Sequence, residues 1–516
     1  VREDSPCVAG VITCLSIYCG PDVDFSKDES EGRSCIWVET MDEKVLMEFK
    51  EYLEDENISK VWHNYGFDRH VLANHDIHLK GFGGDTLHMA RLLDSSKLGS
   101  GSGYSLDQLT KDEKIMSFSP TPVRPKTGMK EIFSRPNVLK IGTLGKKMVL
   151  PSVEELQLDP RTRLQRIHYS ALDAEATWQL RESLHKALEL KAVDENVITA
   201  HYDIKNLWDL YREVWRPFGE ILTDMEKRGI KVNRAYLEEI EEKAAENLKE
   251  LHEDLKGWIV KNCPGAYYMN STSDEQLRVL FFGGFPNKHA PGKRVPKSRV
   301  IEISNPAVHP DGRCNLSVWD PKKQTFKKKN TKNAKLEIQT ITRDVSRLKL
   351  DAFTDSGWPA VSESALKHML GVNAAKIGDG MDSDALAKSM FYQAFNGGDE
   401  GIEACKALSD IINIKRVETL CSGFILPLQG VSKGGGNTVD TNDRIHCSLN
   451  LNTETGRLSA RRPNLQNQPA LEKDIYKIRS AFVAEEGNTL VVADYGQLEL
   501  RLLAHVTSCQ SLLAAF

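Results

Sequence analysis

The sequence lacks several features that would narrow its function at once. No uninterrupted apolar run approaches the ~18 residues that cross a bilayer, so we expect no transmembrane helix. None of the ten cysteines stands in a Cys-x-x-Cys pair with metal-ligand spacing, and we expect reduced thiols in a protein that is not secreted. The sequence does not begin with Met and shows no charged-then-apolar leader, so we expect any targeting segment to lie outside it.

Length and composition are those of a soluble protein with several domains. The chain has 516 residues, of which 40% are hydrophobic and 27% are charged. Because a single hydrophobic core stops growing well below this length, we expect about two to four domains.

Positive charge is concentrated in one part of the chain. Residues 286–350 hold 16 Lys and Arg but only 5 Asp and Glu, a net charge of +11. Because the whole chain carries −5, the remainder carries −16. The excess peaks in residues 322–335, which contain seven lysines and no acidic residue. Such a block suits binding to a polyanion, although a solvated, disordered loop without a partner has the same composition.

The order of predicted elements indicates a mixed α/β part followed by a helical part. We expect strands at 11–18, 34–39 and 59–64, and helices at 41–56, from Tyr65 and at 164–190. Within the helical part, apolar residues recur at intervals of 3 or 4 from Leu237 to Trp258, the pattern of one face of a long helix. A strand-rich region follows, in which residues 489–493 predict a buried strand ending at Asp494.

Four polar residues of the α/β part could form a site that hydrolyses phosphodiesters. Asp68 falls on the first turn of a predicted helix, Asp85 stands at a strand-to-helix junction, and Tyr169 and Asp173 are four apart on one helix face. Hydrolysis by two metal ions needs several carboxylates that converge on Mg²⁺ and a group that orients the attacking water. Taken singly, the aspartates could be helix caps, and the Tyr–Asp pair could be ordinary helix surface.

Together and in this order, these residues resemble the proofreading 3′→5′ exonuclease family with a DEDD-type site of the Tyr subtype. Its second motif, Asn-x3-Asp, matches Asn64 and Asp68, and its third, Tyr-x3-Asp, matches Tyr169 and Asp173. Over residues 8–190 the resemblance implies a ribonuclease H-like α/β fold, Mg²⁺ held by Asp68 and Asp173, Tyr169 as a catalytic residue and Asn64 in contact with DNA. The family's first motif, Asp-x-Glu, has no match, so we expect weak metal binding and little exonuclease activity.

A second segment, residues 453–469, is crowded with planar donors and acceptors. Such side chains suit phosphates and minor-groove base edges, although a polar surface loop could have the same composition. Its members are Arg457, Arg461, Arg462, Asn464, Gln466, Asn467 and Gln468. Residues 488–505 follow, with Asp494 at the end of the predicted strand.

The stretches TGRLSARRPNLQNQP and DYGQLELRLLAH resemble the family A, DNA polymerase I-like DNA polymerases. Their residues are similar to those of the plant organellar branch of that family. The resemblance implies that Asp494, as a catalytic residue, and the carbonyl of Tyr495 hold Mg²⁺. It implies that Glu499 is the steric gate against a ribose and that Arg479 and Gln497 lie at the nucleotide. It also implies DNA contacts for Arg457, Asn464, Gln466 and Asn467 and, because the basic segment falls within the thumb, for Lys327, Lys328 and Lys329.

The resemblance also implies three domains. An exonuclease-like domain without its first strand would span 1–195, connecting helices and a thumb with a basic insertion at about 286–350 would span 196–430, and the start of an α/β palm would span 431–516. The implied activity is that of a DNA-directed DNA polymerase with proofreading. It would act on primer–template DNA and dNTPs in replication and repair in plastids or mitochondria, with no membrane as a partner.

Parts of the polymerase pattern have no match. The family's fingers helix and its later His-Asp-Glu turn, which carries the second palm carboxylate, are not found. Because one aspartate cannot clamp two Mg²⁺ ions, we expect the chain as given to bind primer–template without extending it. We interpret it as a fragment of a family A polymerase, cut at both ends. The alternatives are a catalytically inert DNA-binding protein that kept the scaffold and a stand-alone nuclease, which would not need the polymerase motifs.

Overall fold

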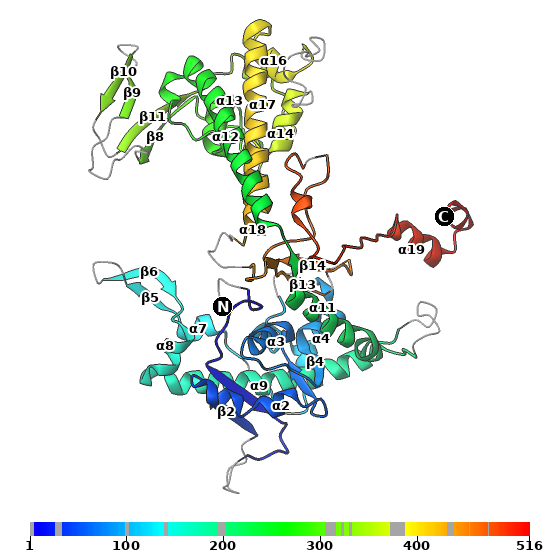
Figure 1. The fold of residues 1–516 in the computed structure, drawn as a ribbon. Coiled ribbons are helices and arrows are strands. Elements are labelled where there is room, and N and C mark those ends of the chain that lie inside the picture. The colour runs from blue at the N-terminus through cyan, green and yellow to red at the C-terminus, as the bar shows by residue number, and fades with distance from the viewer. Residues whose placement is uncertain are drawn as a thin grey trace. The chain divides into compact units, whose positions relative to one another are not determined.

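The computed structural model describes residues 5–516 apart from short gaps. The gaps are 26–33, 99–102, 125, 139–142, 194–202, 305–315, 321–324, 330–332, 372–386, 431–437, 452, 454 and 473. Two compact units are formed: the first comprises residues 1–233, 427–468 and 479–516, and the second comprises 234–426 and 469–478. Figure 1 shows their helices and strands, which confirm the predicted mixture of α/β and α structure.

Two pairs of strands organise the α/β part of the first unit. β1 (Cys14–Tyr18) pairs with β2 (Cys35–Glu39) in antiparallel register. β3 (Lys60–Trp62) pairs with β4 (Phe82–Asp85) in parallel, and the crossover that a parallel pair requires contains α3 (Tyr65–Ala73). The three strands and the helix from Tyr65 expected from the sequence are therefore confirmed.

A long helix, α9 (Pro160–Glu189), packs against β1 and β2. It begins after Asp159, whose carboxylate accepts a hydrogen bond from the amide of Arg161, and proline stands in its first turn; both features favour a helix start. On its inner face Leu180 and Leu184 are fully buried against α4 (Thr86–Leu93). This confirms the long helix expected here and places Tyr169 and Asp173 on a rigid element.

The helix expected at 41–56 is divided into two. α1 (Glu43–Met47) and α2 (Lys50–Glu54) are separated at Phe49, whose backbone lies in the bridge region with φ −93° and ψ 0°. Each short helix buries one leucine in the core cluster around Tyr65. The amphipathic pattern was therefore right about the buried face and wrong about continuity.

The rest of the first unit consists mostly of short elements. Within residues 95–158 they are η1 (Ser95–Leu98), α5 (Leu106–Leu109), α6 (Glu113–Met116), α7 (Met129–Phe133), β5 (Arg135–Val138), β6 (Leu144–Val149) and α8 (Val153–Leu158). The later ones are α10 (Leu207–Leu210), η2 (Tyr211–Trp215), α11 (Arg216–Arg228), β7 (Ile230–Lys231), β12 (Arg444–Ile445), β13 (Ser448–Asn450), β14 (Ser459–Arg461), η7 (Ile478–Ala481), α19 (Leu498–Thr507) and α20 (Gln510–Ala515). β7 pairs with β12, and β13 pairs with β14 in an antiparallel hairpin.

The second unit is built around two long helices, α12 (Arg234–Asn262) and α17 (Gly398–Leu420), which pack against each other (Figure 1). The apolar seam predicted from Leu237 to Trp258 is confirmed, because its residues are buried or packed against the core. The remaining helices between residues 234 and 428 are η3 (Pro264–Ala266), α13 (Asp274–Phe282), η4 (Val345–Arg347), α14 (Glu363–Leu370), α16 (Met390–Ala394), η6 (Cys421–Ile425) and α18 (Leu426–Leu428).

The basic segment contains two antiparallel strand pairs. They are β8 (Ser298–Ser304) with β11 (Asn333–Gln339), and β9 (Leu316–Asp320) with β10 (Thr325–Lys329). Lys327, Lys328 and Lys329 therefore belong to a strand, whereas composition had also allowed a disordered loop there. The other lysines of the run at positions 322, 323 and 332 lie outside the described residues.

The strand predicted at 489–493 is wrong. This stretch is irregular and exposed, with Val491 87% and Val492 90% exposed to solvent. A strand is stabilised by pairing and by a buried face, and among the described strands none pairs with this stretch.

Two further findings concern the described residues only. None of their helices combines the length and apolar character that crossing a bilayer requires. Nine of their cysteines are free thiols.

Candidate active sites

Asp85 is a structural cap. It ends β4, is 1% exposed, and its carboxylate accepts hydrogen bonds from the amides of Asn64 at 2.9 Å, Tyr65 at 2.9 Å and Leu87 at 2.8 Å. One buried carboxylate thus satisfies free amides at the starts of both α3 and α4. The interpretation of this aspartate as a helix cap is confirmed.

Asp68 lies beside that cap on the first turn of α3. Burial, together with the nearby negative charge of Asp85, raises the pKa of Asp68 to about 7. Asn64 precedes the helix in the left-handed conformation, with φ 71°, a geometry that asparagine tolerates better than most residues. The two residues of the Asn-x3-Asp motif therefore stand at one helix start.

Tyr169 and Asp173 share one face of α9, and the structure brings them together through Lys126. The Lys126 ammonium group donates a hydrogen bond to the hydroxyl of Tyr169 at 2.7 Å and forms an ion pair with the carboxylate of Asp173. Lys126 is only 4% exposed. Burial lowers its pKa, but the Asp173 carboxylate outweighs burial, so the net shift is upward. For Asp173, burial raises the pKa and Lys126 opposes the rise.

No sequence motif indicates Lys126. It lies in the proline-rich loop before α7, where no hydrophobic period fixes the direction of a side chain. Its role is visible only because a distant helix supplies the carboxylate and the hydroxyl.

These residues do not fit a pair of metal ions. Within the described parts of the chain, no group of three or more His, Cys, Asp and Glu side chains is arranged to hold a metal ion. Two Mg²⁺ ions need several converging carboxylates, whereas the Asp173 carboxylate is already paired with the ammonium group of Lys126. The protein therefore supplies its own cation at this carboxylate.

The polar segment after β13 forms a tightly bonded hairpin and turn. The side-chain oxygen of Gln466 accepts a hydrogen bond from the backbone amide of Ala460, and its side-chain nitrogen donates one to the carbonyl of Leu458, both at 3.1 Å. The side-chain oxygen of Asn464 accepts from the amides of Gln466 at 3.0 Å and Asn467 at 3.3 Å. Gln466 and Asn464 thus shape the backbone of this segment, and their DNA contacts stay a prediction.

The helix α19 and the hairpin are joined by an exposed ion pair between Arg457 and Glu499. The sequence placed these residues 42 positions apart, and each side chain is 70% exposed. Asp494, Tyr495 and Gln497 precede α19 and are exposed as well. Among the described residues the structure therefore brings Glu499 to Arg457, while Asp494 belongs to no group of three or more metal-binding side chains.

Arg479 lies on η7, and its guanidinium donates to the carbonyl of Gln468 at 3.3 Å. This bond connects the end of the polar segment to the region before Asp494. A role of Arg479 at a nucleotide stays a prediction.

Comparison with known families accounts for both sets of motifs. The model of the 3′-5′ exonuclease family matches residues 25–114, and the model of DNA polymerase family A matches residues 400–516. The chain contains a family A DNA polymerase segment. The exonuclease match contains the Asn64–Asp68 motif, and the family A match contains the hairpin, Asp494 and Glu499.

Plant organellar DNA polymerases are among the relatives of this chain. It is 44% identical to DNA polymerase I A, chloroplastic/mitochondrial, of Arabidopsis thaliana, and 45% identical to DNA polymerase I A, chloroplastic, of Oryza sativa subsp. japonica. Both matches cover 100% of this chain, but 50% and 49% of the respective relative. The chain thus spans about half the length of these relatives.

A solved structure is also similar. The POL domain of Pol1 from M. smegmatis, in complex with DNA primer-template and dNTP, is 19% identical, with a TM-score of 0.47. The match covers 98% of this chain and 57% of that one.

Proposed function

We propose that this chain is the part of an organellar DNA polymerase I that binds primer–template DNA. The whole protein would add dNTPs to a DNA 3′ end under the direction of a template and would carry a proofreading exonuclease domain. The observation that carries this proposal is the family A match over residues 400–516, which includes the hairpin and the stretch around Asp494. The relatives named chloroplastic and mitochondrial support a plastid or mitochondrial location.

In this proposal several exposed polar residues of the polymerase segment have a role. Arg457, Asn464, Gln466 and Asn467 contact primer–template, and Arg479 and Gln497 contact the incoming nucleotide. Glu499 excludes a ribose. Asp494 and the carbonyl of Tyr495 would contribute to an Mg²⁺ site, although among the described residues no group of three or more His, Cys, Asp and Glu side chains is arranged to hold a metal ion. The chain by itself would therefore bind DNA without extending it.

The exonuclease-like half would be weak or inactive. Tyr169, Asp68 and Asp173 match the family motifs, and Asn64 would contact the DNA 3′ end. However, Lys126 neutralises Asp173, and no group of three metal-binding side chains exists among the described residues. The same ion pair favours the second candidate function, a catalytically inert DNA-binding protein that kept the polymerase scaffold.

Three assays on the purified chain separate these functions. We expect fluorescence anisotropy to show binding of a labelled primer–template, while gels show neither extension with Mg²⁺ and dNTPs nor rapid trimming of a 3′ end. Arg457→Ala should weaken binding, and Lys130→Met, which changes an exposed residue of α7, should not. Absence of binding would contradict the proposal, and robust Mg²⁺-dependent trimming would contradict the expected exonuclease defect.

A further inference from the structure

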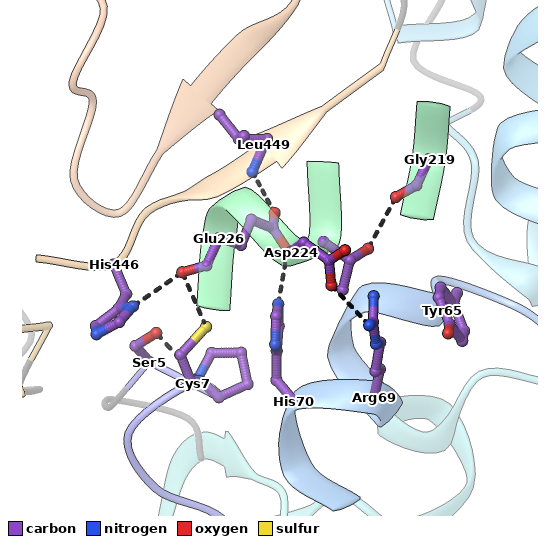
Figure 2. Close-up of polar contacts among 12 residues, drawn as sticks. Ser5, Cys7, Tyr65, Arg69, His70, Gly219, Asp224, Glu226, His446 and Leu449 are labelled. Atoms are coloured by element: carbon purple, nitrogen blue, oxygen red, sulfur yellow. Dashed lines mark hydrogen bonds and ion pairs between the residues drawn. The ribbon is translucent and has the colours of Figure 1, made fainter. Parts of the chain in front are cut away.

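A buried glutamate connects three segments of the first unit that are far apart in the sequence (Figure 2). Glu226 stands near the end of α11 and is 8% exposed. One carboxylate oxygen lies 2.8 Å from Nε2 of His70 on α3, and the other accepts a hydrogen bond from the amide of Leu449 on β13. Because an ionised carboxylate only accepts hydrogen bonds, Nε2 of His70 is the donor.

The backbone of the same residue is also engaged. The carbonyl oxygen of Glu226 accepts from Nδ1 of His446 at 2.8 Å and from the thiol of Cys7 at 3.7 Å. Space around the carboxylate is tight, since a Cβ added at Gly66 of α3 would lie 3.1 Å from it. A charged group in so enclosed a place is costly unless every hydrogen bond is made, so its partners are held firmly in position.

Glu226 makes a link to the hairpin that the other α3–α11 contacts do not make. α3 is also fastened to α11 by Arg69, which pairs with Asp224 at 2.6 Å and donates to the carbonyl of Glu220 at 3.4 Å. Those contacts do not reach the hairpin. Glu226 bonds to both α3 and the hairpin. It therefore connects the helix that carries Asp68 with the strand that leads to Arg457.

The hairpin has a second attachment to the exonuclease-like part. The guanidinium of Arg91, on α4, donates to the carbonyl of Leu451 at 2.7 Å. α4 begins at Asp85, the residue that also caps α3. The first strand of the hairpin, β13, and the residue that follows it are thus attached to α11 and α4.

We propose that Glu226 is a positioning residue for DNA binding, which fixes the β13–β14 hairpin against α3 so that Arg457 meets the primer–template. This rests on the proposed DNA-binding role of the hairpin. Removing the carboxylate would free the Leu449 amide, while the bonds of Arg91 to the Leu451 carbonyl and of His446 to the Glu226 carbonyl would remain. The loss would therefore appear at the hairpin and in DNA affinity, although Glu226 itself does not touch DNA.

The test compares Glu226→Ala and Glu226→Gln with Asp224→Asn, a matched change on the same helix that contacts α3 but not the hairpin. Hydrogen exchange of the Leu449 amide and affinity for a labelled primer–template are measured for each. For Glu226→Ala we expect exchange about tenfold faster and binding several-fold weaker, since a lost hydrogen bond to a charged group is worth roughly a factor of ten. Glu226→Gln keeps an acceptor for the Leu449 amide. Its exchange rate and its DNA affinity should therefore lie between those of Glu226→Ala and those of the unmodified chain.

The outcomes are distinguishable. Equal exchange at Leu449 in Glu226→Ala and Asp224→Asn, or unchanged DNA affinity with faster exchange, would overturn the inference. If Glu226→Ala does not fold, Glu226→Gln carries the same comparison. If the unmodified chain does not bind primer–template, the proposed function fails, whereas the exchange of Leu449 still shows whether Glu226 holds the hairpin.

Discussion

At the scale of single residues, two carboxylates of the exonuclease-like half have partners within the protein. The carboxylate of Asp85 accepts hydrogen bonds from three backbone amides, and that of Asp173 is paired with the buried ammonium group of Lys126. Sequence motifs identify which residue types are present, but not whether a charge is still available for a ligand. That depends on the neighbours that the fold supplies.

The Lys126–Asp173 pair can be tested by a double-mutant cycle. Asp173→Asn leaves a buried ammonium group without its partner and should lower the free energy of unfolding by about 1–3 kcal/mol. Adding Lys126→Met should recover part of that loss, because the unpaired charge is then removed. Unfolding in urea measures the free energy of unfolding of the single and double variants, with Lys130→Met as the exposed control. Additive effects of the two substitutions would show that the pair contributes nothing to stability.

Two important residues could not have been found from the sequence. Lys126 lies in a loop without hydrophobic period, and Glu226 stands among charged residues near the end of α11, where an exposed position is the natural expectation. Both are buried by contacts with segments more than 40 residues away. Asn64, Asp68, Tyr169 and Asp173 were found because a short local motif carries them.

At the scale of elements, helices with a clear local pattern were predicted correctly, whereas a strand whose existence depends on pairing was not. The seam of α12 and the long helix α9 were evident, since a period near 3.6 and helix-start signals lie within the segment itself. The strand expected at 489–493 failed because a strand needs a neighbour elsewhere in the chain. The division of the helix before β3 at Phe49 was also not foreseen.

The packing of α12 and α17 gives stability a pH dependence. Burial, and then the negative charge of Asp254, raise the pKa of Asp410 on α17 to about 6, while Lys406 opposes the shift. In the unfolded chain this group titrates near 3.9, so the folded form binds more protons between about pH 4 and 6. Its contribution to stability is complete below that window and is lost as the pH rises through it.

Asp410→Asn should therefore be more stable than the unmodified chain at pH 7, by about 1–2 kcal/mol after allowance for partial exposure, and little different at pH 4. Unfolding in urea at pH 4, 5, 6 and 7 measures the difference. Asp254→Asn, which changes an exposed residue, should give a smaller effect in the same direction. Parallel stability curves for Asp410→Asn and the unmodified chain would contradict this explanation.

At the scale of the whole molecule, net charge hides the distribution that matters. The chain carries −5, yet residues 286–350 carry +11, and three adjacent lysines of that segment stand on β10. If this segment binds DNA, the affinity should fall steeply as salt rises, because bound lysines release counterions from the phosphates.

Replacing Lys327, Lys328 and Lys329 with glutamine should flatten the plot of log affinity against log salt by up to about 2–3 in slope. The matched control replaces Lys44, Lys80 and Lys111, which are exposed in the first unit, with glutamine. It changes the net charge equally and should leave the slope nearly unchanged. An equal change in both variants would mean that only the overall charge matters.

We propose a DNA-binding surface on a chain that contains a family A polymerase match but among whose described residues no group of three or more side chains is arranged to hold a metal ion. The measurement that tests this account most directly is hydrogen exchange of the purified chain with and without primer–template DNA. We expect DNA to slow exchange in residues 453–468 and in β8–β11, and to leave α1 and α2 unchanged. Unaltered exchange in 453–468 under conditions where the DNA is bound would contradict it.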